Sequence, residues 1–248
     1  MERSNPPSSK KFSDRSRSSS DRSRPSSDRS HRKPDPEERR RFRNFVEPVI
    51  PADVLGTELA KKNFYQLKSL AAENAETVAK QLVMIERLLI SREKSDWQLA
   101  HQFGLSVVYR AGRVGIVREY AGLAALKAEK FEESKRDLRA AHRISGKPGL
   151  LVYIASAELG LKKARKALEI LGEVDAKALG FDDLIKARIV SALARLELGQ
   201  LPAAQVSLNS SDEEKLRKKS DDENPNLQIL LQEWDEVKAR IASELDNS

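Results

Sequence analysis

The sequence predicts an all-α protein built from antiparallel pairs of helices. Between Gly115 and Leu208 a short pattern of small, turn and apolar residues recurs, in phrases that begin at Gly122, Ile154 and Ala192. Each phrase runs from a segment rich in Ala and Leu, through a short polar turn, into a second segment with apolar residues at helical spacing. Such recurrence is typical of helical-repeat proteins, whose units bury their apolar faces against their neighbours. We therefore expect a row of helical hairpins.

The net charge of the chain lies in its N-terminal tail. Of the 248 residues, the first 43 contain 14 Lys or Arg and seven Asp or Glu, which accounts for the whole formal net charge of +7. Ser, Arg, Asp and Pro dominate residues 1–44, and such a segment buries too little apolar surface to offset its ordering entropy. We therefore predict a disordered Ser/Arg-rich tail over residues 1–44.

Two functions of the tail are compatible with its composition. Clustered arginines neutralise phosphates, so the tail could contact nucleic acid weakly and in a salt-dependent way. The interspersed aspartates reduce that effect, and a tail that only keeps the chain in solution fits equally well. Its serines, many of them beside arginines, could also be phosphorylated, which would remove the net positive charge.

Composition also excludes several classes of protein. The chain has no cysteine, which excludes disulfides, thiolate zinc sites, iron–sulfur clusters and thiol nucleophiles. The N-terminus is charged where a signal peptide would need an apolar run, and no stretch approaches about 18 uninterrupted apolar residues. We therefore expect a cytoplasmic protein without a membrane span.

Prolines make residues 43–51 an extended connector ahead of the first helices. Thr57 is a candidate N-cap for a helix that runs to about Leu70. A second helix begins near Glu73, and its wide apolar stripe indicates that it is covered on more than one side.

A third helix should begin at Ser95, which has the form of a capping box with Gln98, and end near Arg110. By topology, residues 73–110 could form one further helical pair that lacks visible repeat residues.

The repeated phrases resemble the tetratricopeptide repeat family. In that family a small residue lies about seven positions before a turn glycine, and an alanine lies five positions after it. The third phrase matches all three positions with Ala192, Gly199 and Ala204. In the first phrase Gly122 holds the small position, but Glu129 replaces the turn glycine.

The second phrase departs further from the family pattern. We place Gly160 in its turn, which puts Tyr153 at the small position and leaves one residue missing before Ala164. The turn-to-turn spacings are then 31 residues from Glu129 to Gly160 and 39 from Gly160 to Gly199. The resemblance implies a tetratricopeptide-like domain over residues 45–208.

Members of this family hold peptides or partner proteins in a groove lined by the first helix of each repeat. The resemblance therefore implies a partner-binding groove lined by Glu119, Leu123, Lys127, Leu150, Ile154, Ile189 and Leu193. These helices contain no asparagine, so the paired Lys and Asn that capture chaperone C-termini in some members are missing. The aliphatic residues of the set would equally fit a core beneath the last helix.

Charge is uneven along the folded part. Residues 110–166 contain 14 basic and six acidic residues, whereas residues 167–248 contain ten and 17. Eight of the basic residues fall on second-helix segments and form what we call the basic ridge: Lys135, Arg136, Arg139, Arg143, Lys162, Lys163, Arg165 and Lys166. The ridge could bind phosphates or an acidic partner, dock the acidic C-terminal segment, or be a solvated face. We favour the solvated face because no aromatic residue is interleaved to stack on bases.

Residues 209–248 read as a charged linker followed by an amphipathic helix. Pro225 suits the first turn of that helix, which carries one apolar stripe that includes Trp234. A repeat array needs its terminal seam covered, so the helix could cap the array. It could also lie in the groove, where it would compete with a ligand, or form a dimer.

Catalytic and cofactor motifs are missing from the sequence. The three histidines, His31, His101 and His142, are widely separated, and phosphate-loop, dinucleotide and nucleophile-elbow patterns are absent. We therefore expect no enzyme activity, no cofactor and no metal site.

These observations lead to a hypothesis of a non-enzymatic scaffold or adaptor that binds a protein partner in a tetratricopeptide-like groove. The alternative is a nucleic-acid or ribosome-associated protein that uses the tail and the basic block of residues 110–166.

Overall fold

The computed structural model describes residues 45–220 and 224–246, and every regular element within them is helical. Their eleven α-helices are α2 (Lys61–Tyr65), α3 (Ala72–Ile90), α4 (Lys94–Ala111), α5 (Gly115–Lys127), α6 (Phe131–Ser145), α7 (Gly149–Gly160), α8 (Ala164–Gly172), α9 (Phe181–Glu197), α10 (Leu201–Ser207), α11 (Ser210–Ser220) and α12 (Pro225–Asp246). Two short 3-10 helices, η1 (Gln66–Ser69) and η2 (Ala176–Ala178), precede α3 and α9. The all-α prediction is confirmed, whereas the disorder predicted for residues 1–44 falls outside the described residues.

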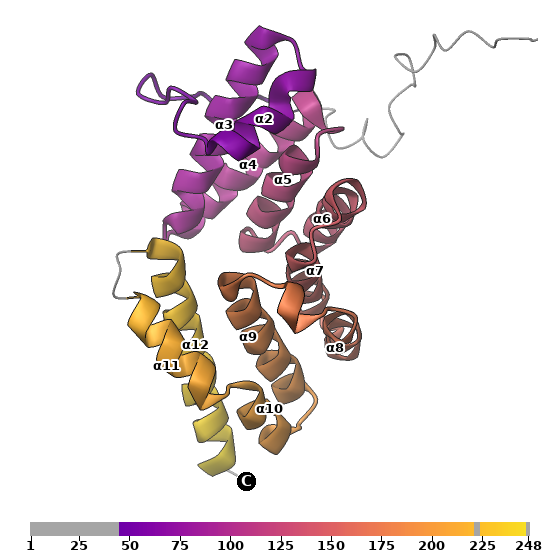
Figure 1. Cartoon of the computed structure of the whole chain (residues 1–248), viewed down its shortest axis with the longest axis vertical. Coiled ribbons are helices and arrows are strands. Elements are labelled where there is room, and N and C mark those ends of the chain that lie inside the picture. Colours follow the sequence, from indigo (N-terminus) through magenta and orange to yellow (C-terminus); the bar gives the residue numbers. More distant parts are fainter. Residues whose placement is uncertain (1–44, 221–223, 247–248) are drawn as a thin grey trace, which may run out of the picture. The chain divides into compact units, whose positions relative to one another are not determined.

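Consecutive helices pack as pairs along the chain (Figure 1). α3 packs against α4, α5 against α6, α7 against α8, and α9 against α10. The first helices of the pairs also contact one another in order, α3 with α5, α5 with α7 and α7 with α9. We call these four helices the first-helix row. Sequential helical hairpins are therefore confirmed, and they include the pair expected from residues 73–110. No helix in the described part of the chain is long and apolar enough to span a membrane.

The turns inside the last three pairs share one backbone geometry. Each turn has one residue in the left-handed region, namely Glu129 (φ 59°), Lys162 (φ 62°) and Gly199 (φ 69°). The amide of the following residue donates to the carbonyl five residues before it, at 2.8–2.9 Å, in the pairs Lys130 to Ala125, Lys163 to Glu158 and Gln200 to Arg195. This is the Schellman arrangement, which satisfies carbonyl groups at a helix C-terminus. The three hairpins therefore repeat in backbone geometry.

This geometry corrects the register of the second hairpin. Gly160 is the last residue of α7, and Lys162 is the left-handed turn residue. The residue seven positions before Lys162 is Ala155, and the residue five positions after it is Ala167; both are fully buried. The placement of Tyr153 at the small position was therefore wrong, and no residue is missing.

Packing against a neighbouring helix explains why position 160 holds a glycine. A Cβ at this position would overlap the ring of Phe131, the first residue of α6. Gly122 has the same kind of role, because a Cβ there would lie 2.6 Å from Cγ of Leu138 in α6. Close approach between neighbouring helices therefore explains two of the glycines in the repeated phrases.

Of the three helix starts predicted before the repeats, the one near Glu73 agrees with α3, whereas the other two are displaced. α2 begins at Lys61 and not after Thr57, because Gly56 (φ 72°) forms a turn in which its carbonyl accepts from the Leu59 amide. α4 begins at Lys94, one residue before the predicted cap Ser95. Among the described residues, no side chain caps the N-terminus of α4. In the turn before the helix, the Ser91 hydroxyl accepts a hydrogen bond from the Glu93 amide at 3.2 Å.

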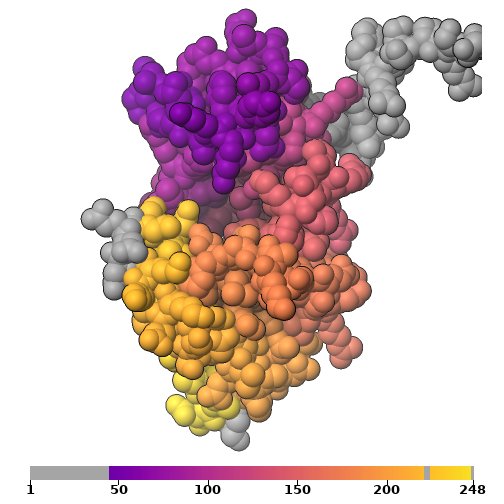
Figure 2. Space-filling view, in the orientation of Figure 1, coloured from indigo at the N-terminus to yellow at the C-terminus, as the bar shows by residue number. Residues whose placement is uncertain are grey.

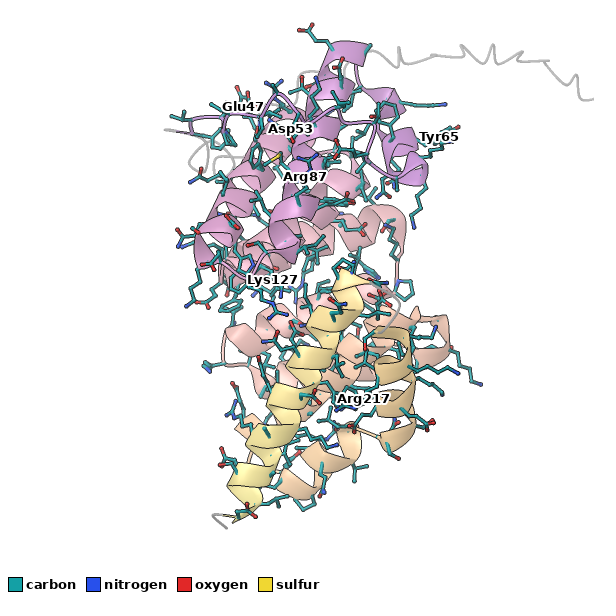
Figure 3. The ribbon with its side chains drawn as sticks, turned by 90° about the vertical axis from the view of Figure 1, so that its left-hand side faces the viewer. Glu47, Asp53, Tyr65, Arg87, Lys127 and Arg217 are labelled. Carbon is teal, nitrogen blue, oxygen red and sulfur yellow. The ribbon has the colours of Figure 1, made fainter. Side chains whose placement is uncertain are left out.

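The connector before α2 is held against the array by charged side chains. Arg110 of α4 donates to both carboxylate oxygens of Glu47, at 2.5 and 2.6 Å. Arg87 of α3 pairs with Asp53 and Glu58 at 2.7 Å each, and Figure 3 shows Arg87 directed toward Asp53. The described part of the connector is therefore in the same compact unit as the helices.

The C-terminal segment packs on the same unit. α12 contacts α9, α10 and α11 along its length and reaches α3. Its buried residues Leu227, Leu230, Trp234, Val237 and Ile241 join residues of α9, α10 and α11 in one hydrophobic cluster. Trp234 is fully buried there. The position of α12 agrees with both intramolecular roles left open for this helix, since it covers the last pair and also reaches the first-helix row.

Candidate functional site

A cavity of about 480 Å³ opens between the first-helix row and the N-terminal half of α12. In the space-filling view it lies where the purple, orange and yellow parts of the chain meet (Figure 2). The cavity is lined by side chains from α3, α5, α7, α9 and α12. The cavity is therefore a part of the surface of the first-helix row that α12 leaves uncovered.

Helix α5 supplies one wall through a single helical face. Glu119, Leu123, Leu126 and Lys127 lie at i, i+4, i+7 and i+8, a spacing that brings side chains to the same side of a helix. The opposite face of α5, which includes the fully buried Ala124, packs into the core.

Helices α3 and α12 supply the apolar edges. Leu89 and Ile90 come from the last turn of α3, and Ile90 remains 43% exposed. Ile229 and Leu230 come from the first half of α12. Partly exposed aliphatic side chains gathered in a hollow are the usual lining of a binding site.

Glu233 of α12 is a charged residue of the cavity lining. It accepts from Lys186 of α9 at 2.5 Å and from Lys127 of α5 at 3.3 Å. The Lys127 ammonium also lies 5.5 Å from the centre of the Trp97 ring, and in Figure 3 Lys127 lies next to α12. Burial raises the pKa of Glu233, but the two ammonium groups outweigh burial and lower this pKa on balance. Glu233 therefore joins α12 to the first-helix row as an ionised group.

The buried Tyr120 and the partly buried Tyr153 occupy equivalent positions, nine residues before the left-handed turn residue in their hairpins. Tyr120 donates its hydroxyl to Glu86 and accepts from Asn63 at 3.0 Å. Tyr153 is hydrogen-bonded to Asp183. Burial is the main cause that raises the pKa of both phenols, with the neighbouring carboxylates adding to it. Both tyrosines therefore stay neutral donors at physiological pH.

Acidic side chains gather at the end of the cavity formed by α5 and α9. We call Glu119, Asp182 and Asp183 the acidic rim; the first two line the cavity. Burial raises the pKa of Asp183, and the nearby Asp182 and Glu119 carboxylates raise it further by repulsion. Lys147 pairs with Glu119 at 2.5 Å. Asp182 has no ion pair with any residue that the structure describes.

The predicted groove residues divide between cavity and core. Glu119, Leu123 and Lys127 line the cavity. Leu150, Ile154 and Ile189 are 1–3% exposed and lie in the hydrophobic clusters, and Leu193 is partly buried between both clusters. On α7 the groove residues were chosen wrongly because the turn residue is Lys162 and not Gly160. The residue of α7 that lines the cavity is Tyr153, which the predicted register placed at the helix-packing position.

The basic ridge is largely paired with carboxylates of the chain itself. Six of its eight residues have an acidic partner within 4 Å: Lys135, Arg136, Arg139, Lys162, Lys163 and Lys166. The buried Glu158 takes both Arg139 at 3.0 Å and Lys135 at 3.8 Å. Arg143 and Arg165 are exposed and have no ion pair with the described residues. The ridge therefore presents few uncompensated cations.

The described residues contain no group of three or more His, Asp or Glu side chains placed to hold a metal ion. His101 pairs with Glu133 at 3.4 Å, on the second helices of two neighbouring pairs. Neither residue lines the cavity.

Comparisons with models of protein families, with curated proteins and with solved structures found no match.

Several cavity residues could not be chosen from the sequence. Lys186 and Glu233 are 47 residues apart in the chain. They meet only because α12 packs against α9. Ile90 gave a weak signal, since it ends an apolar helix before the polar run 91–95. The lining places apolar and charged side chains in one cavity.

Proposed function

We propose that this chain is a non-enzymatic interaction scaffold of the tetratricopeptide-like class, which binds a protein partner at the cavity beside α12. The observation that carries the proposal is the set of partly exposed aliphatic side chains in one hollow, among them Leu89, Ile90, Leu123, Leu126 and Ile229. Water in contact with such a surface is released when an apolar partner covers it, which favours binding.

The assignment to this class is supported by the repeated hairpin geometry. Three turns share a left-handed residue and the same hydrogen bond, and their left-handed residues are 33 and 37 positions apart. The small residues that flank the turns, Gly122, Ala155 and Ala192, are buried between helices. A family whose repeats average 34 residues and pack through such small positions fits these features.

The position of α12 limits where a partner can bind. α12 covers α9 and reaches α3, so it occupies the part of the surface on α9 that the groove hypothesis assigned to a ligand. The cavity beside its first half is large enough for a few side chains of a partner. Interfaces often concentrate their binding energy in a few such anchor side chains.

A crosslinked pull-down with the full chain tests this proposal. We expect Ile90→Asp to reduce recovery of specific partners by about tenfold or more, because it places a charge against the apolar edge of the cavity. Ile144→Asp is the matched control: Ile144 is also an exposed isoleucine near a helix C-terminus, and it lies outside the cavity lining. Equal recovery with both variants and wild type would contradict the proposal.

The same experiment with nuclease addresses the nucleic-acid hypothesis. We expect protein recovery to survive nuclease treatment, because most of the basic ridge is paired with carboxylates of the chain. Loss of all partners after nuclease treatment would favour the nucleic-acid role instead.

A further inference from the structure

The cavity lining has more negative than positive groups, and its positive groups are already paired. Its lining has four carboxylates, from Glu86, Glu119, Asp182 and Glu233, and two ammonium groups, from Lys127 and Lys186. Both ammonium groups bind Glu233, so neither is free for a ligand. The unmatched charge of the cavity is therefore negative.

The negative charge is concentrated at the acidic rim. Asp182 contributes a carboxylate to the cavity wall without an ion pair among the described residues. Asp183 is the next residue and is desolvated, and Lys147, which pairs with Glu119, lowers the pKa of Asp183 only in part. A cation that entered here would relieve repulsion between carboxylates that folding has brought together.

Another part of the cavity lining is aliphatic. Leu89 and Ile90 of α3 form it from one helix and Ile229 from another, and Ile90 is 43% exposed. A ligand that matches both parts of the lining needs a positive group and an apolar group that fit into one cavity of about 480 Å³. An Arg or Lys side chain next to a Leu or Ile in a polypeptide meets this requirement.

We propose that the cavity selects a partner segment in which an Arg or Lys lies beside aliphatic residues, with the cation at the acidic rim and the aliphatic side chains against Leu89 and Ile90. This inference rests on the proposed function, since it names the partner chemistry of the same site. The rim supplies selectivity, because an acidic segment would meet like charge there. The aliphatic edge supplies the apolar contact.

Fluorescence anisotropy with the full chain and short labelled peptides tests this inference. The probe peptide has Leu-Arg-Leu-Leu at its centre, and two matched peptides replace Arg by Glu or all Leu by Ser. We expect the Arg-Leu peptide to bind at least about tenfold more tightly than either matched peptide, with affinity that falls as salt screens the rim. Equal binding of the Glu peptide would overturn the inference.

Variants of the chain locate the charge effect. Asp182→Lys should weaken binding of the Arg-Leu peptide by about tenfold or more, since it replaces the unpaired rim carboxylate by a cation. Glu236→Lys, on an exposed part of α12, makes the same change in net charge and should leave binding within about twofold of wild type. Equal losses in both variants would show that only net charge matters and would overturn the inference.

The failure of this inference is distinguishable from failure of the proposed function. If Ile90→Asp abolishes partner recovery while Asp182→Lys changes neither recovery nor peptide binding, the cavity is a partner site without the proposed cation preference. If neither variant affects recovery, both proposals fail. A circular dichroism spectrum and unfolding curve like those of wild type are required of each variant before its binding is compared.

Discussion

Two turn residues of the array, Glu129 and Lys162, adopt a left-handed backbone conformation without being glycine. Their φ angles are 59° and 62°, close to the 69° of Gly199 in the equivalent turn. For residues with a Cβ this region is sterically disfavoured by about 1–2 kcal/mol. The turns are therefore strained at two of three equivalent positions.

We predict that Glu129→Gly and Lys162→Gly each stabilise the chain by about 0.5–1 kcal/mol, since relief of backbone strain exceeds the entropy that glycine loses on folding. Urea unfolding followed by circular dichroism measures the change. Gly199→Ala is the control and should destabilise by a similar amount. Destabilisation by both glycine substitutions would contradict this reading of the turns.

At the same scale, Glu47 ties the N-terminal connector to α3 and α4. Hydrogen bonds from Arg110 are the main cause that lowers the pKa of Glu47 to about 2, with further bonds from Ser106 and Gln81. A carboxyl whose pKa is lowered on folding stabilises the protein above its unfolded pKa, near 4.5 here. That contribution is lost as pH falls through the folded value.

We predict that Glu47→Gln lowers the free energy of unfolding at neutral pH by about 1–2 kcal/mol, a figure reduced for solvent screening because the side chain is partly exposed. The difference from wild type should shrink as pH falls from about 4.5 to about 2, because wild type then loses the same contribution. Urea unfolding of both proteins across this pH range measures it. A difference independent of pH would refute the assigned role of Glu47.

At the scale of elements, the spacing between helices depends on glycines that face a neighbouring helix. Gly160 ends α7 where the Phe131 ring of α6 occupies the space of a Cβ. Gly172 ends α8, and the space that a Cβ would take there is open, with no neighbouring group within 4 Å. These two glycines are therefore a natural pair for comparison.

We predict that Gly160→Ala destabilises the chain by about 1–3 kcal/mol because the Phe131 ring must move. Gly172→Ala should change stability by less than about 1 kcal/mol. A double-mutant cycle with Phe131→Ala measures the coupling: the cost of Gly160→Ala should largely disappear in that background. A cost that persists unchanged would show that Gly160 is needed for another reason.

Periodicity and turn spacing predicted the class of fold and the hairpins, because both depend on local sequence. They failed at Gly160, where the choice between turn residue and packing residue depends on a ring in the preceding helix. They also failed for Thr57, because a turn at Gly56 precedes the helix. The cavity was predicted only on α5; its remaining walls depend on where α12 lies, which no local pattern specifies.

At the scale of the whole folded unit, α12 determines both the core and the site. It completes the last hydrophobic cluster through Trp234 and leaves the cavity beside its first half. It is joined to the first-helix row by Glu233, between Lys127 and Lys186. The proposed binding site exists only if α12 has this position.

A zero-length carbodiimide crosslink tests that position most directly, because the reagent joins an amine to a carboxylate only when the two are in contact. In the full wild-type chain, peptide mass spectrometry should find Lys186 joined to Glu233, whose atoms lie 2.5 Å apart. Lys238 joined to Glu213, at 2.8 Å between α12 and α11, serves as the internal control. Recovery of both crosslinks is the predicted result. Recovery of the control without any crosslink from Glu233 to Lys186 or Lys127 would contradict the account.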